Sequence, residues 1–556
     1  MRAFRLLLIL SLLTAVLAAC GNGGASNNTV EVSIVYGSEK RAWLEEAVNR
    51  FNTTRPKTDS GATIRVTATP LGSSDALTQI LNGTLQPVVW SPASRILLPV
   101  ANDEWGKRNP GQQLVSEDAP PLVLSPVVIA IWEPMARVLG WPDRPIGWAE
   151  VAELLASGKT WADFGRPEWG PVQFGHTHPD YSNSGITTII AITYAAVGKT
   201  RGLTVADVEN PRTAEFMRKI QSGIIHYGES TGFFAEQMFK RGPGYLSMAV
   251  LYENAVIESR DRARYPNLAT PAVAMYPREG TFWSDHPYAI LNAPWVSAEQ
   301  RAAAELFKNF LLDQPQQELA LTYGFRPASV NVPIGAPIIP ENGVDPQQPV
   351  TLLEVPRPDV LAAVRSIWAA NKKRVDVMAV LDVSGSMREE NRLEQAKAAL
   401  RIFVEQLDDA DGFGLTIFSS EATVLSPISP IGPKRAEMLE RIAGLAPSGQ
   451  TRLLDTIAEA YTVLARDPPG QRIRAIIVLT DGLDNQSARS GDELLALLGQ
   501  DEAGYSIKVF TIAFGGDADA NLLRQIAEAS GAKGYVGKPD EPGSIERVYL
   551  DIAVFF

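Results

Sequence analysis

An apolar run at residues 375–381 ends in Asp382-Val383-Ser384-Gly385-Ser386. The run predicts a buried β-strand, and the residues after it predict a loop at the carboxyl end of that strand. Asp, Ser and Gly are ordinary turn residues, so the five residues alone are weak evidence for a site. Even so, one carboxylate and two hydroxyls at alternate positions can converge there on one cation. Ligands that are all oxygen favour Mg²⁺ or Mn²⁺ over zinc.

Two further segments supply matching oxygens later in the chain. Thr451 stands at the start of a predicted helix with apolar residues at three- and four-residue spacing, and Asp481 directly follows a second apolar run. Ligand sites in open α/β sheets lie at the carboxyl ends of the strands, so we expect these two residues to join the first three. Strands predicted at 412–418 and 507–514 alternate with helices, which predicts a doubly wound, mostly parallel sheet.

Residues 373–556 resemble a von Willebrand factor type A domain, which has a Rossmann-like α/β fold. The three segments resemble its metal-ion-dependent adhesion site. The resemblance implies that the metal is held directly, or nearly so, by three hydroxyls and either directly or through water by two carboxylates. It also implies that an acidic group of a protein partner completes the coordination. The implied metal residues are Ser384, Ser386 and Thr451 with Asp382 and Asp481. A domain of this fold that has lost its metal is the alternative.

The first residues predict the location of the protein. Residues 1–19 combine a basic start, an apolar stretch and small residues, which is typical of a signal peptide. Cys20 follows at once and is the only cysteine of the chain, and residues 17–20 resemble a bacterial lipoprotein cleavage site. The resemblance implies that Cys20 carries lipid, so that the protein is anchored to the cell membrane at its extracytoplasmic face. Residues 20–29 then serve as a flexible tether. An ordinary secretory signal is the alternative.

Residues 30–340 are predicted to form a separate α/β unit. Strands at 30–36 and 63–69 enclose a helix, and a short strand within residues 86–94 ends in serines. The unit resembles the bacterial extracellular solute-binding proteins, two-lobed periplasmic-binding-like proteins that deliver ligands to ATP-driven importers. In that family the chain crosses to a second lobe and returns, and we expect crossings near Val123–Trp132 and Ala272–Leu291.

Candidate solute-binding groups lie at predicted helix starts and interlobe loops. They suit a small polar or anionic solute, because hydroxyls and free N–H groups gather there. Most single serines of this kind are helix caps, which is the plainer interpretation. The candidates are Ser38, Ser73, Ser74, Ser91 and Ser94 in lobe 1, and Ser182, Ser184 and Tyr252 in lobe 2. His176 and His178 lack further metal ligands nearby, so we interpret them as solvated loop histidines.

Residues 341–372 are predicted to be a linker followed by a connecting helix. The helix begins near Pro356 and has an apolar face, so it either packs on one of the two domains or acts as a spacer. A net charge of −12 without a basic cluster argues against nucleic acid as a partner. The sequence shows no nucleophile–base arrangement and no phosphate-binding loop, so we do not expect an enzyme.

The favoured function is a lipid-anchored binding protein. Its solute-binding part recognises a small ligand, and its metal site binds an acidic group of a partner protein in the presence of Mg²⁺. One alternative is the substrate-binding subunit of an ABC-type importer, with the A domain as a docking module. Another is an adhesive or scaffold protein whose solute cleft is vestigial.

Overall fold

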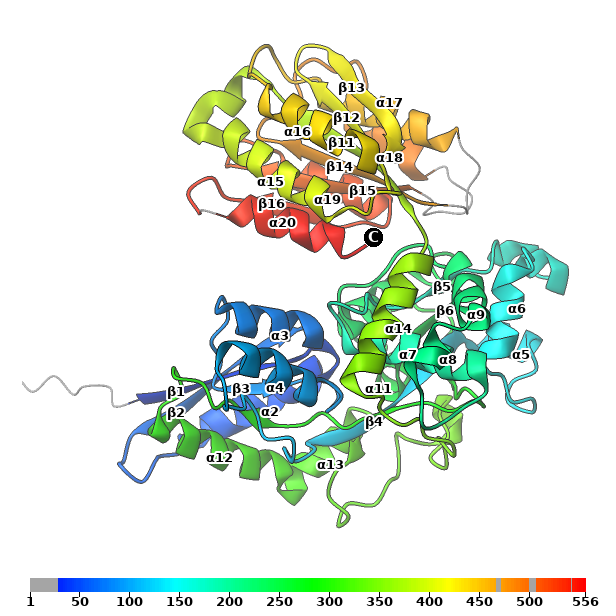
Figure 1. Ribbon diagram of the computed structural model, residues 1–556, viewed down its shortest axis with the longest axis vertical. Helices are drawn as coiled ribbons and strands as arrows, with labels where there is room; N and C mark the ends of the chain where they lie inside the picture. Colours follow the sequence, from blue (N-terminus) through cyan, green and yellow to red (C-terminus); the bar gives the residue numbers. More distant parts are fainter. Residues whose placement is uncertain (1–28, 467–471, 500–506, 542) are drawn as a thin grey trace, which may run out of the picture.

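The computed structural model describes residues 29–466, 472–499, 507–541 and 543–556. The predicted signal peptide, the lipidated Cys20 and all but the last residue of the tether lie outside the described residues. Within those residues no helix combines the length and the apolar character needed to cross a bilayer. Three β-sheets organise these described residues, and Figure 1 shows them in two lower lobes and an upper carboxyl-terminal domain.

Lobe 1 is built on a four-stranded sheet with the order β2-β1-β3-β9. The first three strands are parallel, and β9 pairs antiparallel with β3 after the chain has passed through lobe 2. Apolar residues of α2, such as Trp43, Ala47 and Phe51, recur at helical spacing and are buried. The elements are β1 (Thr29–Gly37), α2 (Arg41–Thr53), β2 (Thr63–Leu71), α3 (Ser73–Asn82), β3 (Val89–Ser91), α4 (Leu97–Arg108), β9 (Ala289–Ile290), α12 (Ala298–Leu312) and α13 (Gln314–Thr322).

Lobe 2 is built around β4, whose residues are almost all buried. The sheet order is β10-β4-β6-β5, and β7 and β8 also pair with β4. The chain enters lobe 2 at β4 and returns between β8 and β9, within the two segments expected to cross. The strands are β4 (Val123–Trp132), β5 (Phe174–Gly175), β6 (Met248–Tyr252), β7 (Ala272–Met275), β8 (Trp283–Ser284) and β10 (Arg326–Pro327). The helices are α5 (Glu133–Val138), α6 (Trp148–Ala156), α7 (Asn183–Val197), α8 (Val205–Val208), α9 (Pro211–Ser222), α10 (Thr231–Arg241) and α11 (Glu253–Glu258).

The carboxyl-terminal domain has a six-stranded sheet with the order β13-β12-β11-β14-β15-β16. All neighbouring strands are parallel except β12 and β13, so the sheet is mostly parallel, as predicted. The strands are β11 (Val375–Asp382), β12 (Gly412–Phe418), β13 (Ala422–Pro430), β14 (Ile473–Thr480), β15 (Ile507–Phe514) and β16 (Gly534–Gly537). The helices are α15 (Arg392–Gln406), α16 (Arg435–Ala443), α17 (Leu453–Ala465), α18 (Gly491–Gly499), α19 (Ala520–Ala529) and α20 (Ser544–Ala553).

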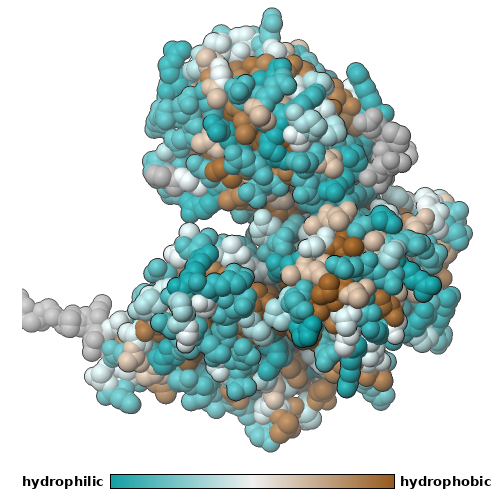
Figure 2. Space-filling view, in the orientation of Figure 1, coloured by the Kyte–Doolittle hydropathy of each residue, from teal (hydrophilic) through white to brown (hydrophobic). Residues whose placement is uncertain are grey.

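The connecting helix α14 (Pro358–Asn371) packs on lobe 2 rather than acting as a free spacer. The Trp368 ring lies 4.8 Å from the His178 ring and 5.6 Å from the Tyr227 ring. Two residues after α14, the ammonium of Lys373 donates to the carbonyl of Ile224 over 2.7 Å. In Figure 2 the surfaces of lobe 2 and the carboxyl-terminal domain are continuous, whereas a notch separates that domain from lobe 1.

Candidate metal site and solute cleft

Three loops bring the predicted metal residues to one edge of the carboxyl-terminal sheet. Asp382 ends β11, and Asp481 directly follows β14. These two strands are parallel neighbours with Leu381 opposite Leu479, so both carboxylates leave the sheet at the same edge. The loop that carries Thr451 joins them there, because Gly385 N–H donates to the Gly449 carbonyl over 3.0 Å.

Direct contacts link the side chains of this cluster. The hydroxyls of Ser384 and Ser386 lie 3.0 Å apart, and Ser386 donates to Asp481 Oδ1 over 2.7 Å. A Cβ atom added to Gly482 would lie 3.6 Å from Thr451 Oγ1 and 3.7 Å from Ser386 Oγ. These two hydroxyls therefore face the same side of Gly482.

Asp382 and Asp481 both have no exposed surface, and Asp382 is held by two hydrogen bonds. Its Oδ1 accepts the Ser384 N–H over 2.7 Å, and its Oδ2 accepts the Thr480 hydroxyl over 2.5 Å. Burial raises the pKa of Asp382 to about 6; the hydrogen bonds from Thr480 and Ser384 oppose this shift, and the charge of Asp481 adds to it. A cation bound at this edge would relieve the repulsion between the Asp382 and Asp481 charges.

Thr451 is fixed by the loop that follows Asp481. Its N–H donates to Asn485 Oδ1 over 2.9 Å, and the N–H of Leu453 donates to Asp484 Oδ1 over 2.8 Å. The loop after β14 therefore caps the start of α17 and sets the distance between Thr451 and Asp481.

Arg392 was missed in the sequence, although it lies against the cluster. Its guanidinium, 6% exposed, donates to Asp481 Oδ2 over 3.0 Å and to Glu390 over 3.1 Å. Gly515 makes room for it: a Cβ there would lie 3.2 Å from the guanidinium carbon, and its φ of +97° also favours glycine. The sequence did contain a signal for Arg392, because this residue begins a helix shortly after the Asp-x-Ser-x-Ser motif.

The donor set fits a hard divalent cation. It consists of carboxylate and hydroxyl oxygens on one sheet edge, which Mg²⁺ and Mn²⁺ prefer. Within the described ranges no group of three or more His, Cys, Asp or Glu side chains gathers to hold a metal, at this edge or elsewhere, so the candidate site depends on its hydroxyls as well as on its two carboxylates. Asp382, Ser384, Ser386, Thr451 and Asp481 would hold the ion.

The second candidate site lies between the two lobes, which touch directly. Ser38 donates to the Ser230 hydroxyl over 2.9 Å, and the N–H of Gly232 donates back to Ser38 over 3.0 Å. The N–H of Asp75 in α3 donates to the Tyr181 carbonyl over 3.1 Å. The cleft is therefore closed, and all eight predicted solute residues are buried.

Six of these eight side chains make hydrogen bonds within the protein, and four of the six bond within a single lobe through serine hydroxyls. Ser73 accepts the Ala93 N–H over 3.0 Å, and Ser94 accepts the Ile96 N–H over 3.1 Å, so these two hold lobe 1 loops in place. Ser182 and Ser184 contact the Thr231 hydroxyl over 3.2 Å and 2.8 Å and so link the starts of α7 and α10.

Other buried polar atoms of the cleft have no hydrogen-bond partner among the described residues. They are Ser74 Oγ, Ser91 Oγ, Asn183 Oδ1 and His286 Nε2. Tyr252 joins two of them, because its hydroxyl accepts from Asn183 over 3.0 Å and its ring lies 5.9 Å from the His286 ring. A buried polar group without a partner costs about 1–3 kcal/mol, so a molecule that hydrogen-bonds to these atoms would stabilise the closed lobes.

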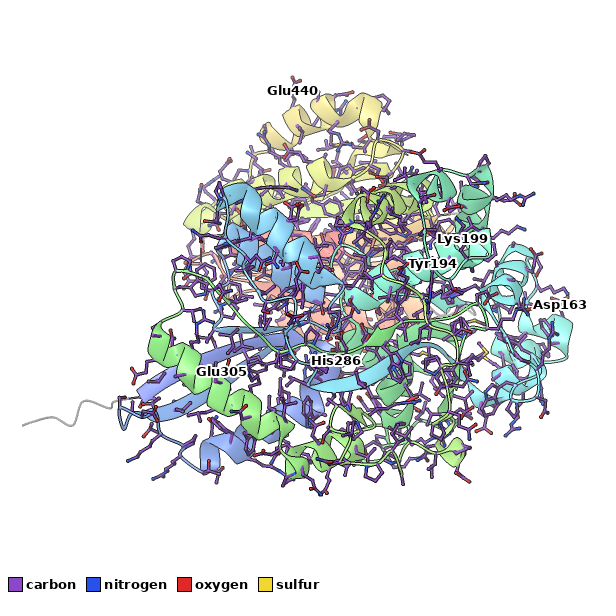
Figure 3. The ribbon with its side chains drawn as sticks, turned by 60° about the horizontal axis from the view of Figure 1, so that its bottom comes forward. Asp163, Tyr194, Lys199, His286, Glu305 and Glu440 are labelled. Atoms are coloured by element: carbon purple, nitrogen blue, oxygen red, sulfur yellow. The ribbon has the colours of Figure 1, made fainter. Side chains whose placement is uncertain are left out.

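A buried ion pair at the cleft was not predicted. The Lys40 ammonium, with no exposed surface, donates to Glu39 over 2.9 Å and to the Ser91 carbonyl over 3.1 Å, and it lies 3.1 Å from His286 Nδ1. Burial alone would raise the pKa of Glu39, but Lys40 and His286 hold it at about 2. Figure 3 shows His286 where the strands of lobe 1 meet β4 of lobe 2.

The interpretation of His176 and His178 as solvated loop histidines was wrong. His176 has no exposed surface and contacts Gln221 and the Thr177 carbonyl. His178, 7% exposed, is covered by Trp368 of α14. The connecting helix therefore buries a loop that looked exposed in the sequence.

Comparisons with known proteins agree with this architecture. The family model described as "Bacterial extracellular solute-binding protein" matches residues 32–326, and that of the von Willebrand factor type A domain matches residues 376–549. An uncharacterized protein of Mycobacterium tuberculosis (strain ATCC 25618 / H37Rv) is 22% identical over 514 residues, which cover 88% of this chain and 71% of the relative. The human inter-alpha-trypsin inhibitor heavy chain H6 is 28% identical over 162 residues, 27% of this chain and 12% of the relative.

Solved structures of both kinds are among those that the chain matches in part. A periplasmic thiamin binding protein has a TM-score of 0.44 at 14% identity and covers 62% of this chain and 97% of its own. A von Willebrand factor type A protein from Catenulispora acidiphila has a TM-score of 0.29 at 23% identity, covering 33% of this chain and 42% of its own. On the family matches, the chain belongs to the bacterial extracellular solute-binding proteins and carries a von Willebrand factor type A domain behind the solute-binding unit.

Proposed function

We propose that this protein is a lipid-anchored, extracytoplasmic binding protein with two recognition sites. The carboxyl-terminal domain binds an acidic group of a partner protein through Mg²⁺, and the two lobes bind a small solute. Both matched families are typically binding modules rather than catalysts, which supports binding as the role of the whole chain.

The observation that carries the metal site is the oxygen cluster at the sheet edge. Asp382 is buried and repelled by the charge of Asp481, and the hydroxyls of Ser384, Ser386 and Thr451 contact each other or lie beside the same glycine. A divalent cation there neutralises the carboxylates and leaves a coordination position for a partner carboxylate. The partner is recognised by charge and by coordination geometry.

Mg²⁺ titration of the full chain by calorimetry tests the metal site. Asp382→Ala should abolish Mg²⁺ binding, whereas Glu440→Ala, which removes an exposed carboxylate from α16 of the same domain, should leave it unchanged. Binding of the protein to an immobilised peptide rich in Asp and Glu should then require Mg²⁺ and stop in chelator. Peptide binding that persists in chelator would contradict the proposal.

For the cleft we propose an uncharged polar solute, such as a molecule with several hydroxyl or amide groups. The atoms without partners belong to two hydroxyls, an amide and an imidazole, while the charged Lys40 and Glu39 already neutralise each other. The sequence predicted a small polar or anionic solute, and our proposal keeps only the uncharged polar class. A thermal-shift screen of neutral sugars and amides against oxyanions tests the class, since a bound solute raises the melting midpoint by mass action.

Delivery of that solute to an ABC-type importer is the alternative function. The closed cleft with its buried, unsatisfied polar atoms favours capture of a solute, which such a subunit requires. Solute uptake by intact cells separates the two functions: removal of the protein should abolish uptake if it is an importer subunit, and should leave uptake unchanged if it is a binding protein that serves no importer.

A further inference from the structure

We propose that closure of the solute cleft and docking of the carboxyl-terminal domain on lobe 2 are energetically coupled through residues 226–232. This segment, the junction segment, contacts lobe 1 on one side and the carboxyl-terminal domain on the other. The inference rests on the proposed role of the cleft as a solute site and adds a means of regulating it.

The carboxyl-terminal domain holds one side of the junction segment. The N–H of Tyr227 donates to the carbonyl of Phe555 over 3.3 Å, and the Phe555 ring lies 6.1 Å from the His226 ring. The ammonium of Lys533 lies 3.6 Å from the Glu229 carboxylate and 5.6 Å from the centre of the Phe233 ring.

Lobe 1 holds the other side, only a few residues further along. The Ser38 hydroxyl donates to Ser230 and accepts from the N–H of Gly232. A Cβ atom on Gly232 would come within 2.6 Å of the Ser38 carbonyl oxygen, so the backbones are as close as a glycine permits. These contacts exist only while the lobes are closed.

The junction segment is stiff, so its two sides do not move independently. Backbone hydrogen bonds join Gly228 to His176 over 3.2 Å and to His178 over 2.9 Å. The Thr231 hydroxyl donates to Ser184 over 2.8 Å, and the Tyr227 hydroxyl donates to Gln221 over 2.8 Å. A shift imposed at Tyr227 or Glu229 is therefore transmitted to Ser230.

The rest of the interface fixes the carboxyl-terminal domain to lobe 2 by further bonds. Arg241 of α10 donates to the carbonyl of Glu528 over 3.2 Å and to that of Ala532 over 3.4 Å. Lys372, which directly follows α14, donates to the Phe556 carbonyl over 2.9 Å. The carboxyl-terminal domain is thus docked on lobe 2, and its last residues are part of the interface.

Coupling follows from this arrangement by linkage. When the carboxyl-terminal domain is docked on lobe 2, Ser230 and Gly232 are already held in the positions in which they contact Ser38. Closure of the two lobes therefore costs less conformational entropy in the docked protein than in the undocked protein. Coupling of this kind is reciprocal: whatever favours closure, a solute included, must favour docking by the same factor.

Engineered thiols test the coupling without any solute or metal. In the full chain with Cys20→Ser, we place Ser38→Cys and Ser230→Cys and measure the fraction of disulfide at equilibrium with reduced and oxidised glutathione. Lys533→Ala and Arg241→Ala, which weaken docking, should each lower the disulfide-to-dithiol ratio at least threefold. Lys538→Ala, which removes another lysine of the same domain paired with Glu541, should leave the ratio unchanged. Equal ratios in all variants would overturn the proposal.

A second measurement uses the cysteine pair alone, in case the docking variants fold poorly. Hydrogen exchange of the Tyr227 amide, which donates to Phe555, should slow at least threefold when the disulfide is formed. Equal exchange in the oxidised and reduced proteins would also overturn the coupling. Neither readout depends on a solute, so an absence of solute binding would refute the proposed cleft function and leave this result standing.

Discussion

The Arg392 guanidinium donates to Asp481 Oδ2 over 3.0 Å, and both side chains are almost completely buried. Asp481 uses its other oxygen for Ser386. Two side chains therefore orient the Asp481 carboxylate of the candidate metal site. One is the guanidinium of Arg392, the first residue of α15, and the other is the Ser386 hydroxyl of the Asp-x-Ser-x-Ser motif.

Removal of Arg392 should destabilise the metal-free protein more than the Mg²⁺-loaded protein. Arg392→Ala leaves the buried Asp481 without its cation, which costs about 3–5 kcal/mol in unfolding free energy, and Mg²⁺ restores part of that compensation. Thermal unfolding with Mg²⁺ and with chelator measures the difference. Arg401→Ala, at an exposed position of the same helix, is the control. An equal loss in both conditions would contradict the account.

The Glu39–Lys40 pair predicts a double-mutant result. Lys40→Met should lower the unfolding free energy by about 3–5 kcal/mol, because the buried Glu39 then lacks its cation. Glu39→Gln combined with Lys40→Met should recover most of the loss, since neither charge remains. Urea denaturation of Glu39→Gln, Lys40→Met and the double variant measures the interaction. Additive losses would show that the two side chains act independently.

Truncation of two serines of the cleft should affect the unfolding free energy differently. Ser91→Ala removes a buried hydroxyl that has no partner among the described residues, so the solute-free protein should gain about 1 kcal/mol or stay unchanged. Ser73→Ala removes the acceptor of the Ala93 N–H and should lose about 1 kcal/mol. Chemical denaturation compares them. A loss in Ser91→Ala as large as in Ser73→Ala would indicate that Ser91 is satisfied in the solute-free protein.

Acid should destabilise the protein below neutral pH. All four histidines are buried, and burial lowers the pKa of His176 and His286 to about 4 and that of His226 to about 3. A lowered histidine pKa gives stability that is present above the unfolded value near 6.5 and is lost as pH falls toward the folded value. Each of these three histidines should cost about 2 kcal/mol between pH 7 and pH 5.

Asp551 opposes part of this acid effect. Burial raises its pKa to about 6, so its contribution to stability is lost as pH rises from its unfolded value toward 6. Urea denaturation at pH 7, 6 and 5 should therefore show a net fall in unfolding free energy toward pH 5. The fall should be smaller in His226→Gln. A profile that is flat or rises toward pH 5 would contradict the burial of neutral histidines.

The sequence predicted the strands of the carboxyl-terminal sheet wherever apolar runs were continuous. The predictions at 412–418 and 507–514 match β12 and β15 residue for residue. The edge strand β13 was missed because it contains Pro427 and Pro430 and is partly exposed, which hides the pattern of a strand.

The site was less predictable where it depends on long-range contacts. The motif pointed to Asp382 and its serines, because their spacing is local. Arg392 and Lys40 were missed, since a basic residue is expected at the surface and only tertiary packing shows a buried acidic partner. The burial of His176 likewise depends on elements distant in sequence.

We propose that five oxygen-bearing residues at one sheet edge hold a divalent metal. A crystal structure of the protein grown with Mn²⁺, with anomalous diffraction recorded, tests it directly. We expect one strong anomalous peak coordinated by Ser384, Ser386 and Thr451, with Asp382 and Asp481 bound directly or through water, and no peak there in Asp382→Ala. The absence of a peak at this edge in the unmodified protein, at saturating Mn²⁺, would contradict it.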